Sequence, residues 1–250
     1  MILTIQRHQN GETATETFDI ASLRVTTLLG AFYEIKAKLD PTLTFDAGCR
    51  SGACGRCAVR VNGRETLACS HILKGDEHVE PLQYHPIERD LKVDKSQARA
   101  RIIPVDGRVK GIPGDRHTLP KDEERYRLQT DCILCDSCYS ACPVLAVNPD
   151  FLGPFALTRV WRYAADSRYD EEVGSPKASL LDAVQTNGIW DCTLCGECTA
   201  VCPQHIDPKS DILHLRTASL QAGYSDPTFA QQSFGVPDFG GGFDPNTPIF

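Results

Sequence analysis

Long apolar runs are missing from this 250-residue sequence. A membrane-spanning helix needs about 20 consecutive, mainly apolar residues, so no such helix is predicted. The opening MILTIQRHQNGE also lacks the basic start and the apolar stretch of a secretory signal. We therefore expect the chain to stay in the cytosol, unless a partner carries it elsewhere.

Positive charge is scarce in the second part of the chain. Residues 1–105 carry 14 Lys or Arg against 13 Asp or Glu, whereas residues 106–250 carry 12 against 20. Because phosphate backbones are bound by basic faces, nucleic acid is excluded as the main partner. Ser/His/Asp sets, paired carboxylates and Gly-rich phosphate loops are also absent from the sequence. We expect no catalytic residue and no substrate site on this chain.

Cysteine is absent outside three short groups, which together hold all twelve cysteines. A reducing cytosol disfavours disulfides. Four-cysteine zinc sites usually pair two C-x2-C knuckles across a longer loop, which differs from the spacing here. Residues 131–143 (DCILCDSCYSACP) and 191–203 (DCTLCGECTAVCP) each match the C-x2-C-x2-C-x3-C-P run of bacterial ferredoxins. Residues 48–57 (GCRSGACGRC) match the plant-type C-x4-C-x2-C run. These three matches favour iron–sulfur clusters over disulfides and zinc.

The duplicated motif predicts which cysteines share a cluster. Three cysteines at two-residue gaps surround one cubane cluster, and the fourth, before the proline, ligates the other cluster. The plant-type group is expected to bind iron as [2Fe–2S] through Cys49, Cys54, Cys57 and Cys69. The first [4Fe–4S] is expected to be bound by Cys132, Cys135, Cys138 and Cys202. A second [4Fe–4S] is expected to be bound by Cys142, Cys192, Cys195 and Cys198.

Residues 1–105 have the pattern of a small mixed fold. ILTIQ and TETFDI flank Asn10-Gly11, and CAVRV and RETLAC flank Asn62-Gly63, so two hairpins are predicted. Apolar residues at helical spacing predict a helix within Val25–Leu39, with Thr26 or Thr27 as its cap. IERDLKVD predicts one last strand. Gly48, Gly52 and Gly55 are expected to let backbone N–H groups approach the cysteine sulfurs.

The remainder is predicted to be helical. Residues 106–120, within a segment rich in Pro and Gly, are expected to be a linker. Residues 121–222 contain LTRVWRYAADSR and PKSDILHLRTASL, which favour helices around the two bacterial-type motifs. Residues 223–250 are predicted to form an extended tail, and they hold five of the ten Phe residues. Because disordered segments are usually poor in aromatics, we hypothesise that this tail lies along a partner subunit.

The chain resembles the iron–sulfur subunits of succinate dehydrogenases and fumarate reductases over nearly all of residues 1–220. The resemblance rests on the text and order of LTFDAGCRSGACGRC, ETLACS, PIERDLKVD, FLGPFALTRVWRYAADSR and CPQHIDPKSDI. It implies an α+β chain, with an N-terminal β-grasp plant-type ferredoxin domain followed by an all-α bacterial-type two-cluster ferredoxin domain.

The same resemblance implies a role and partners. The chain would be the electron-transfer subunit of a succinate or fumarate oxidoreductase complex, connecting a flavoprotein subunit that carries FAD to a quinone-linked, membrane-associated partner. Such a complex would lie in the cytoplasm, peripherally on the inner face of the cell membrane. The alternative is the iron–sulfur subunit of a thiol-linked fumarate reductase, or of another flavoprotein dehydrogenase.

Two departures from that family concern the third cluster and the quinone contacts. The usual third cluster is [3Fe–4S], whose ligands would here be Cys142, Cys192 and Cys198. Cys195 fills the position that is usually apolar, so a second [4Fe–4S] is expected and [3Fe–4S] is the alternative. The family's quinone-contacting Trp and His are replaced by residues 144–147 (VLAV) and Thr193. These departures resemble the divergent branch whose partner subunit is cysteine-rich rather than a haem-bearing helical anchor.

Overall fold

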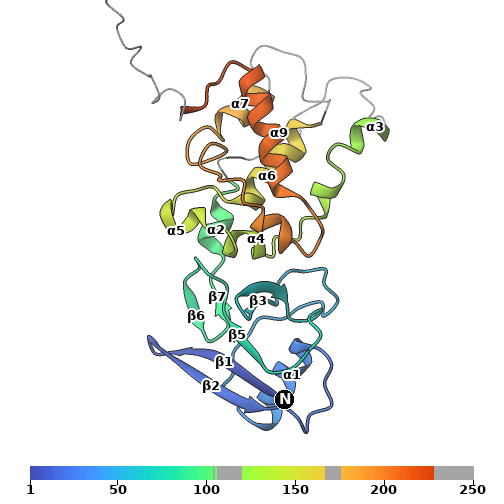
Figure 1. Ribbon diagram of the computed structural model, residues 1–250, viewed down its shortest axis with the longest axis vertical. Helices are drawn as coiled ribbons and strands as arrows, with labels where there is room; N and C mark the ends of the chain where they lie inside the picture. The colour runs from blue at the N-terminus through green and yellow to red at the C-terminus, as the bar shows by residue number, and fades with distance from the viewer. Residues whose placement is uncertain (104, 106–119, 167–175, 228–250) are drawn as a thin grey trace, which may run out of the picture.

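The chain folds into two lobes along its long axis, one built on a sheet and one helical (Figure 1). This computed structural model describes residues 1–103, 105, 120–166 and 176–227. The predicted linker, residues 106–120, lies outside the described residues except for its last residue. Most of the predicted tail, residues 228–250, also lies outside them. Within the described ranges, no helix has both the length and the apolar character needed to cross a membrane.

Seven strands form the sheet lobe, which carries the N-terminus (Figure 1). They are β1 (Ile2–Gln9), β2 (Glu12–Asp19), β3 (Ala58–Val61), β4 (Arg64–Leu67), β5 (Glu77–Glu80), β6 (Ile87–Arg89) and β7 (Lys92–Val93). The main sheet has the order β2-β1-β5-β3-β4. Strand β1 is antiparallel to β2 and parallel to β5, whereas β3 is antiparallel to β4 and β5. This mixed sheet, packed with one helix, is the expected β-grasp arrangement.

Local sequence signals account for the hairpins and the helix. Asn10-Gly11 and Asn62-Gly63 all have positive φ, as two-residue hairpin turns of the primed type require. Helix α1 (Leu28–Lys38) begins after Thr27, whose hydroxyl accepts a hydrogen bond from Gly30 N. Its apolar face packs in one core with Leu3 and Ile5 of β1. The two hairpins and the capped helix are therefore confirmed.

Two parts of the sheet lobe differ from the prediction. IERDLKVD does not form one strand, because the chain reverses at Asp90, whose φ is 48°, and pairs β6 with β7 as a separate two-stranded sheet. The central strand β5 was not predicted at all. Its residues, EHVE, are mostly polar, and the long-range pairing with β1 and β3 overrides that weak local preference.

The helical lobe contains several one-turn helices and two longer ones. The short elements are α2 (Ser96–Ala100), α3 (Pro120–Glu123), the 3-10 helix η1 (Leu128–Asp131), α4 (Ser137–Ser140), α5 (Val144–Val147), α7 (Pro176–Asp182) and α8 (Glu197–Ala200). The two helices expected around the motifs are confirmed as α6 (Pro154–Ala164) and α9 (Pro208–Gln221), which pack against each other. Both begin with proline, which suits the first helical turn because it lacks an N–H group.

The lobes have separate hydrophobic cores, and the cysteine loops lie between and beside them. Phe151, Phe155 and Leu157 are almost fully buried in the helical lobe. Ala98 of α2 and Val105 belong to this second core, although they precede the predicted linker. Cys135, in contrast, packs in the core of the sheet lobe. The first bacterial-type cysteine loop therefore touches both cores.

Candidate iron–sulfur sites

The plant-type loop directs backbone N–H groups at its sulfur atoms. Ser51 N and Ala53 N donate to Cys49 Sγ over 3.4 and 3.3 Å, and Gly52 N donates to Cys69 Sγ over 3.3 Å. Such donors stabilise negative charge on sulfur, which is what a ligated thiolate carries. A Cβ at Gly48 would lie 2.9 Å from Cys54 Sγ, so a side chain there would obstruct the sulfur.

The four thiols of this loop differ in exposure. Cys49 is exposed, and the Ser51 N–H group is the main cause that lowers its pKa to about 6. Cys57 is buried, and loss of hydration raises its pKa to about 12, with the neighbouring thiols of Cys69 and Cys54 adding to the rise. The predicted residues Cys49, Cys54, Cys57 and Cys69 thus lie together in one loop and the strand end that follows it.

The two bacterial-type motifs share one backbone conformation. Leu134 and Leu194 occupy matching positions and both have positive φ, 51° and 57°. Two residues later, Asp136 and Gly196 are also left-handed, at 67° and 87°, and each directly precedes a one-turn helix, α4 or α8. Each motif therefore turns twice within four residues, which wraps its first three cysteines round one centre.

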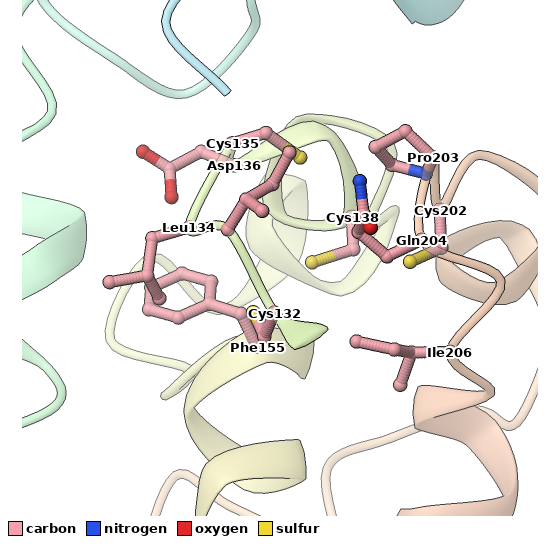
Figure 2. Close-up of a pocket in the computed structure, with 11 residues that line it drawn as sticks. Cys132, Leu134, Cys135, Asp136, Cys138, Phe155, Cys202, Pro203, Gln204 and Ile206 are labelled. Carbon is pink, nitrogen blue, oxygen red and sulfur yellow. The ribbon is translucent and has the colours of Figure 1, made fainter. Parts of the chain in front are cut away.

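Four predicted ligands of the first cubane site line one pocket (Figure 2). Its walls also include the apolar side chains of Leu134, Phe155 and Ile206, and Pro203 follows the fourth cysteine. Figure 2 shows the sulfur atoms of Cys138 and Cys202 directed into this space, from different motifs. The cysteines that line it are Cys132, Cys135, Cys138 and Cys202.

The second quartet gathers at the neighbouring ends of the motifs. Burial raises the pKa of Cys142 to about 11. The thiols of Cys192 and Cys195 lie close enough to Cys142 to add to this rise. Cys198 interacts in the same way with Cys192 and Cys142, and burial raises its pKa to about 12. Cys195 is the exposed member of the four. Leu194 N donates to Cys192 Sγ over 3.3 Å, as the backbone does in the plant-type loop.

The donor set, cysteine thiols alone, fits iron–sulfur clusters, which are held by cysteine thiolates. No three His, Cys, Asp or Glu side chains in the described part of the chain are arranged to hold one ion. A cubane is much larger than an ion, so its four thiolates stand further apart. Burial also raises the pKa of Cys132 to about 11 and that of Cys138 well above its usual value of 9.0. Only nearby positive charge, such as iron, would keep these buried thiols deprotonated.

The plant-type loop contacts the first cubane loop directly. A Cβ on Gly55 would lie 2.8 Å from Cys135 Cα, so the two backbones touch. Lys95 Nζ donates to Cys135 O over 2.8 Å and to Gly55 O over 3.4 Å, and Gln204 Nε2 donates to Gly52 O over 3.2 Å. Sequence reasoning missed Lys95 and Gln204, because no local signal identifies a partner 40 or more residues away.

Comparison with known proteins agrees with both halves of this arrangement. Residues 2–100 match the family described as "2Fe-2S iron-sulfur cluster binding domain", and residues 128–206 match the "4Fe-4S dicluster domain". A fumarate reductase iron–sulfur subunit of Haemophilus influenzae is 38% identical over 215 residues, covering 78% of this chain and 82% of the relative. A succinate dehydrogenase iron–sulfur subunit of Paracoccus denitrificans is 34% identical over 197 residues, covering 76% and 74%.

A solved structure has the same fold. One chain of the Mycobacterium smegmatis Sdh1 complex in the apo form superposes with a TM-score of 0.75 at 23% identity. The match covers 90% of this chain and 97% of that chain. The arrangement of a sheet lobe followed by a helical lobe is therefore shared with a known complex subunit.

Proposed function

The chain belongs to the family of fumarate reductase and succinate dehydrogenase iron–sulfur subunits, and from this membership we propose that its twelve cysteines hold three iron–sulfur centres. As such a subunit of an oxidoreductase complex it transfers electrons. The proposed ligands are Cys49, Cys54, Cys57 and Cys69 for [2Fe–2S], Cys132, Cys135, Cys138 and Cys202 for [4Fe–4S], and Cys142, Cys192, Cys195 and Cys198 for the third centre. When bound, the clusters supply reversible one-electron storage.

The carrying observation is that the three cysteine groups form one continuous series. Gly55, in the plant-type loop, touches Cys135 of the first cubane loop. Cys138 of that loop in turn lies close enough to Cys198, in the second motif, for the two thiols to interact electrostatically. Contact between successive groups supports a path that enters at one lobe and leaves at the far side of the other.

Residues of this chain around the proposed clusters favour electron transfer along this path. Backbone donors such as Gly52 N and Leu194 N stabilise the negative charge on ligand sulfurs. Apolar walls such as Phe155 and Ile206 exclude water from the first cubane pocket. A rigid, dry surrounding reduces the rearrangement that accompanies each change of charge.

We propose a second [4Fe–4S] as the third centre. Cys195 lies near Cys142 and Cys192, so it is placed to complete a four-thiolate set. In the [3Fe–4S] alternative, only Cys142, Cys192 and Cys198 would be ligands. The exposed position of Cys195 is also compatible with that alternative, which makes this position the decisive one to test.

The proposed partners follow from the two ends of the series. A flavoprotein subunit with bound FAD would dock at the plant-type loop, where Cys49 is exposed. A membrane-associated partner, cysteine-rich or an anchor, would dock beside the third centre and connect it to quinone. Val147, which is 85% exposed on α5 just after Cys142, supports an apolar contact there. The complex would lie on the inner face of the cell membrane through its partners.

Low-temperature EPR of the anaerobically purified, oxidised protein, with iron counted on the same sample, tests the cluster assignment. We expect no strong signal and about ten irons per chain, because oxidised [2Fe–2S] and [4Fe–4S] clusters are silent. A strong oxidised signal that does not grow in air, with about nine irons, would overturn the second [4Fe–4S]. A colourless, iron-free protein would overturn the function itself.

Succinate-dependent dye reduction by the purified complex then tests the partner assignment. Activity is expected if the flavoprotein interconverts succinate and fumarate. Loaded clusters without this activity would favour the alternatives, a thiol-linked fumarate reductase or another flavoprotein dehydrogenase.

A further inference from the structure

Lys95 places an ammonium group at the boundary between two cluster loops. It lies between β7 and α2, just before the chain leaves the sheet lobe. Its Nζ atom donates to the carbonyl oxygens of Cys135, over 2.8 Å, and Gly55, over 3.4 Å. One side chain thus holds a backbone group from each loop at the point where these loops touch.

The positive charge of Lys95 lies close to the first cubane loop. Its Nζ atom lies 2.8 Å from the carbonyl oxygen of Cys135, a proposed ligand of the first [4Fe–4S] centre. Lys95 is partly buried, so water screens this charge less than it screens a charge on the open surface.

Asp136 is the carboxylate that interacts most strongly with Lys95. It is 1% exposed, and neither carboxylate oxygen has a hydrogen-bond partner among the residues described. Figure 2 shows its carboxylate directed away from the sulfur atoms of Cys138 and Cys202. Arg99, Asp46 and the buried ring of His85 also interact with one or both members of this pair.

We propose that Lys95 is a positioning residue that raises the reduction potential of the first [4Fe–4S] centre, through an ammonium held beside Cys135 by the Gly55 and Cys135 carbonyls. The inference rests on the proposed function, because it requires a cluster at that site. Adding one electron makes the centre more negative, and a fixed positive charge stabilises that form. The electron passes between the [2Fe–2S] and the first [4Fe–4S] without any bond being formed or broken.

The test is a potentiometric titration, followed by EPR, of the anaerobically purified, cluster-loaded complex. Lys95→Met removes the charge and both hydrogen bonds while keeping an unbranched side chain. We expect it to lower the reduced-to-oxidised ratio of the first [4Fe–4S] about tenfold at a given potential, or about 59 mV for a one-electron couple. Lys95→Arg keeps the charge, so its first [4Fe–4S] should have a reduction potential close to that of the parent. The third centre should be unchanged.

Two controls separate the ammonium from other effects. Lys92→Met removes a lysine three residues earlier that pairs with Glu88 on the surface of the sheet lobe, and it should shift nothing. Asp136→Asn removes the counter-charge, and Asn accepts the left-handed conformation of that position. In the Asp136→Asn background, Lys95→Met should still lower the potential, because the carboxylate of Asp136 is no longer there to compensate.

The outcomes distinguish this inference from the proposed function. If the parent complex lacks the [4Fe–4S] signal on reduction, the proposed function fails. If the parent has the signal, and Lys95→Met leaves the reduction potential of the first [4Fe–4S] unchanged in both backgrounds, the inference alone is overturned. Should Lys95→Met load poorly, Lys95→Gln, which is neutral but retains a donor, is titrated instead. An unchanged potential in Lys95→Gln would equally overturn the role of the charge.

Discussion

The hydroxyl group of Ser140 donates a 2.7 Å hydrogen bond to Glu65 Oε1 and thereby joins the two lobes. Ser140 lies on α4, between two cysteines of the first bacterial-type motif, and Glu65 lies on β4. The same hydroxyl accepts a hydrogen bond from Gln83 N over 2.8 Å. Ser140 is fully buried and Glu65 is 6% exposed, so this pair is shielded from water. Arg60 Nε lies 3.2 Å from Glu65 Oε1, so the guanidinium group balances the negative charge of this buried carboxylate.

Ser140→Ala is expected to destabilise the contact between the lobes. It removes the hydroxyl from Glu65 and leaves Gln83 N without its acceptor, at a cost of about 2 kcal/mol. For a chain of this size, that lowers Tm by about 4–8 °C. Ser70→Ala, which removes the hydroxyl of an exposed residue bonded to Leu67 O, is the matched control. Equal Tm values for the two variants under anaerobic conditions would contradict the role of Ser140.

Gly55→Ala is expected to separate the plant-type loop from the first cubane loop. Its φ is +68°, and the added Cβ would lie 2.8 Å from Cys135 Cα, a backbone atom that cannot give way. Gly52→Ala is the control, because its φ is +77° but nothing lies within 4 Å of the added Cβ. Both variants carry the left-handed strain of about 1 kcal/mol. Gly55→Ala alone should also lose iron, measured after purification, and similar iron contents would argue against close contact.

Cys195→Ala is expected to convert the third centre into a three-iron cluster. The variant removes one of four neighbouring thiols and leaves Cys142, Cys192 and Cys198. An oxidised EPR signal should then appear, and iron should fall from about ten to about nine per chain. Cys195→Ser retains an oxygen that can ligate iron, so it should show a weaker signal. If the parent protein already gives the full signal, Cys195 is not a ligand.

Asp211 is expected to make stability depend on pH between 4 and 6. The residue is 2% exposed on α9, and burial raises its pKa from 3.8 to about 6, although Gln129 Nε2 donates to it over 2.7 Å. The folded state therefore keeps a proton that the unfolded chain releases. This contribution is fully present below about pH 4 and is lost as the pH rises through about 6, amounting to about 3 kcal/mol.

The variant Asp211→Asn tests this dependence. It should raise Tm relative to the parent protein at pH 8, where the parent carries a buried charge, and by about half as much at pH 5. Asp150→Asn, at an exposed position, should show no such difference between the two pH values. A gain for Asp211→Asn that is the same at both pH values would mean that ionisation of Asp211 is not the cause.

Local sequence signals predicted much of this protein. The turns at Asn10-Gly11 and Asn62-Gly63 need left-handed residues, and the cap at Thr27 needs a hydroxyl, so each could be read without knowledge of the rest of the chain. Cysteine spacing within each motif predicts the cluster types, and the exchange of one cysteine between motifs stays a prediction. The turns, the cap and the spacing within each motif depend on residues that are close in sequence, where backbone geometry limits the alternatives.

Tertiary contacts decided what local signals could not. Strand β5 is central because β1 and β3 pair with it, although its own residues favour a strand only weakly. Arg7 occupies an inward position of β1 and is tolerated there because Asp40 and Asp90, distant in sequence, neutralise it. Gly55 was expected to make room for sulfur, yet its surroundings show that it makes room for the backbone of Cys135.

The sequence by itself therefore determined the inventory of the protein: three cysteine groups, the elements that carry them and the family they indicate. The tertiary structure decided how these parts meet, through the contact of Gly55 with Cys135, the bond from Ser140 to Glu65 and the ammonium of Lys95. The physical reason is that a packed boundary depends on residues 40 to 80 positions apart, and nothing in their local sequence specifies which of them will come into contact.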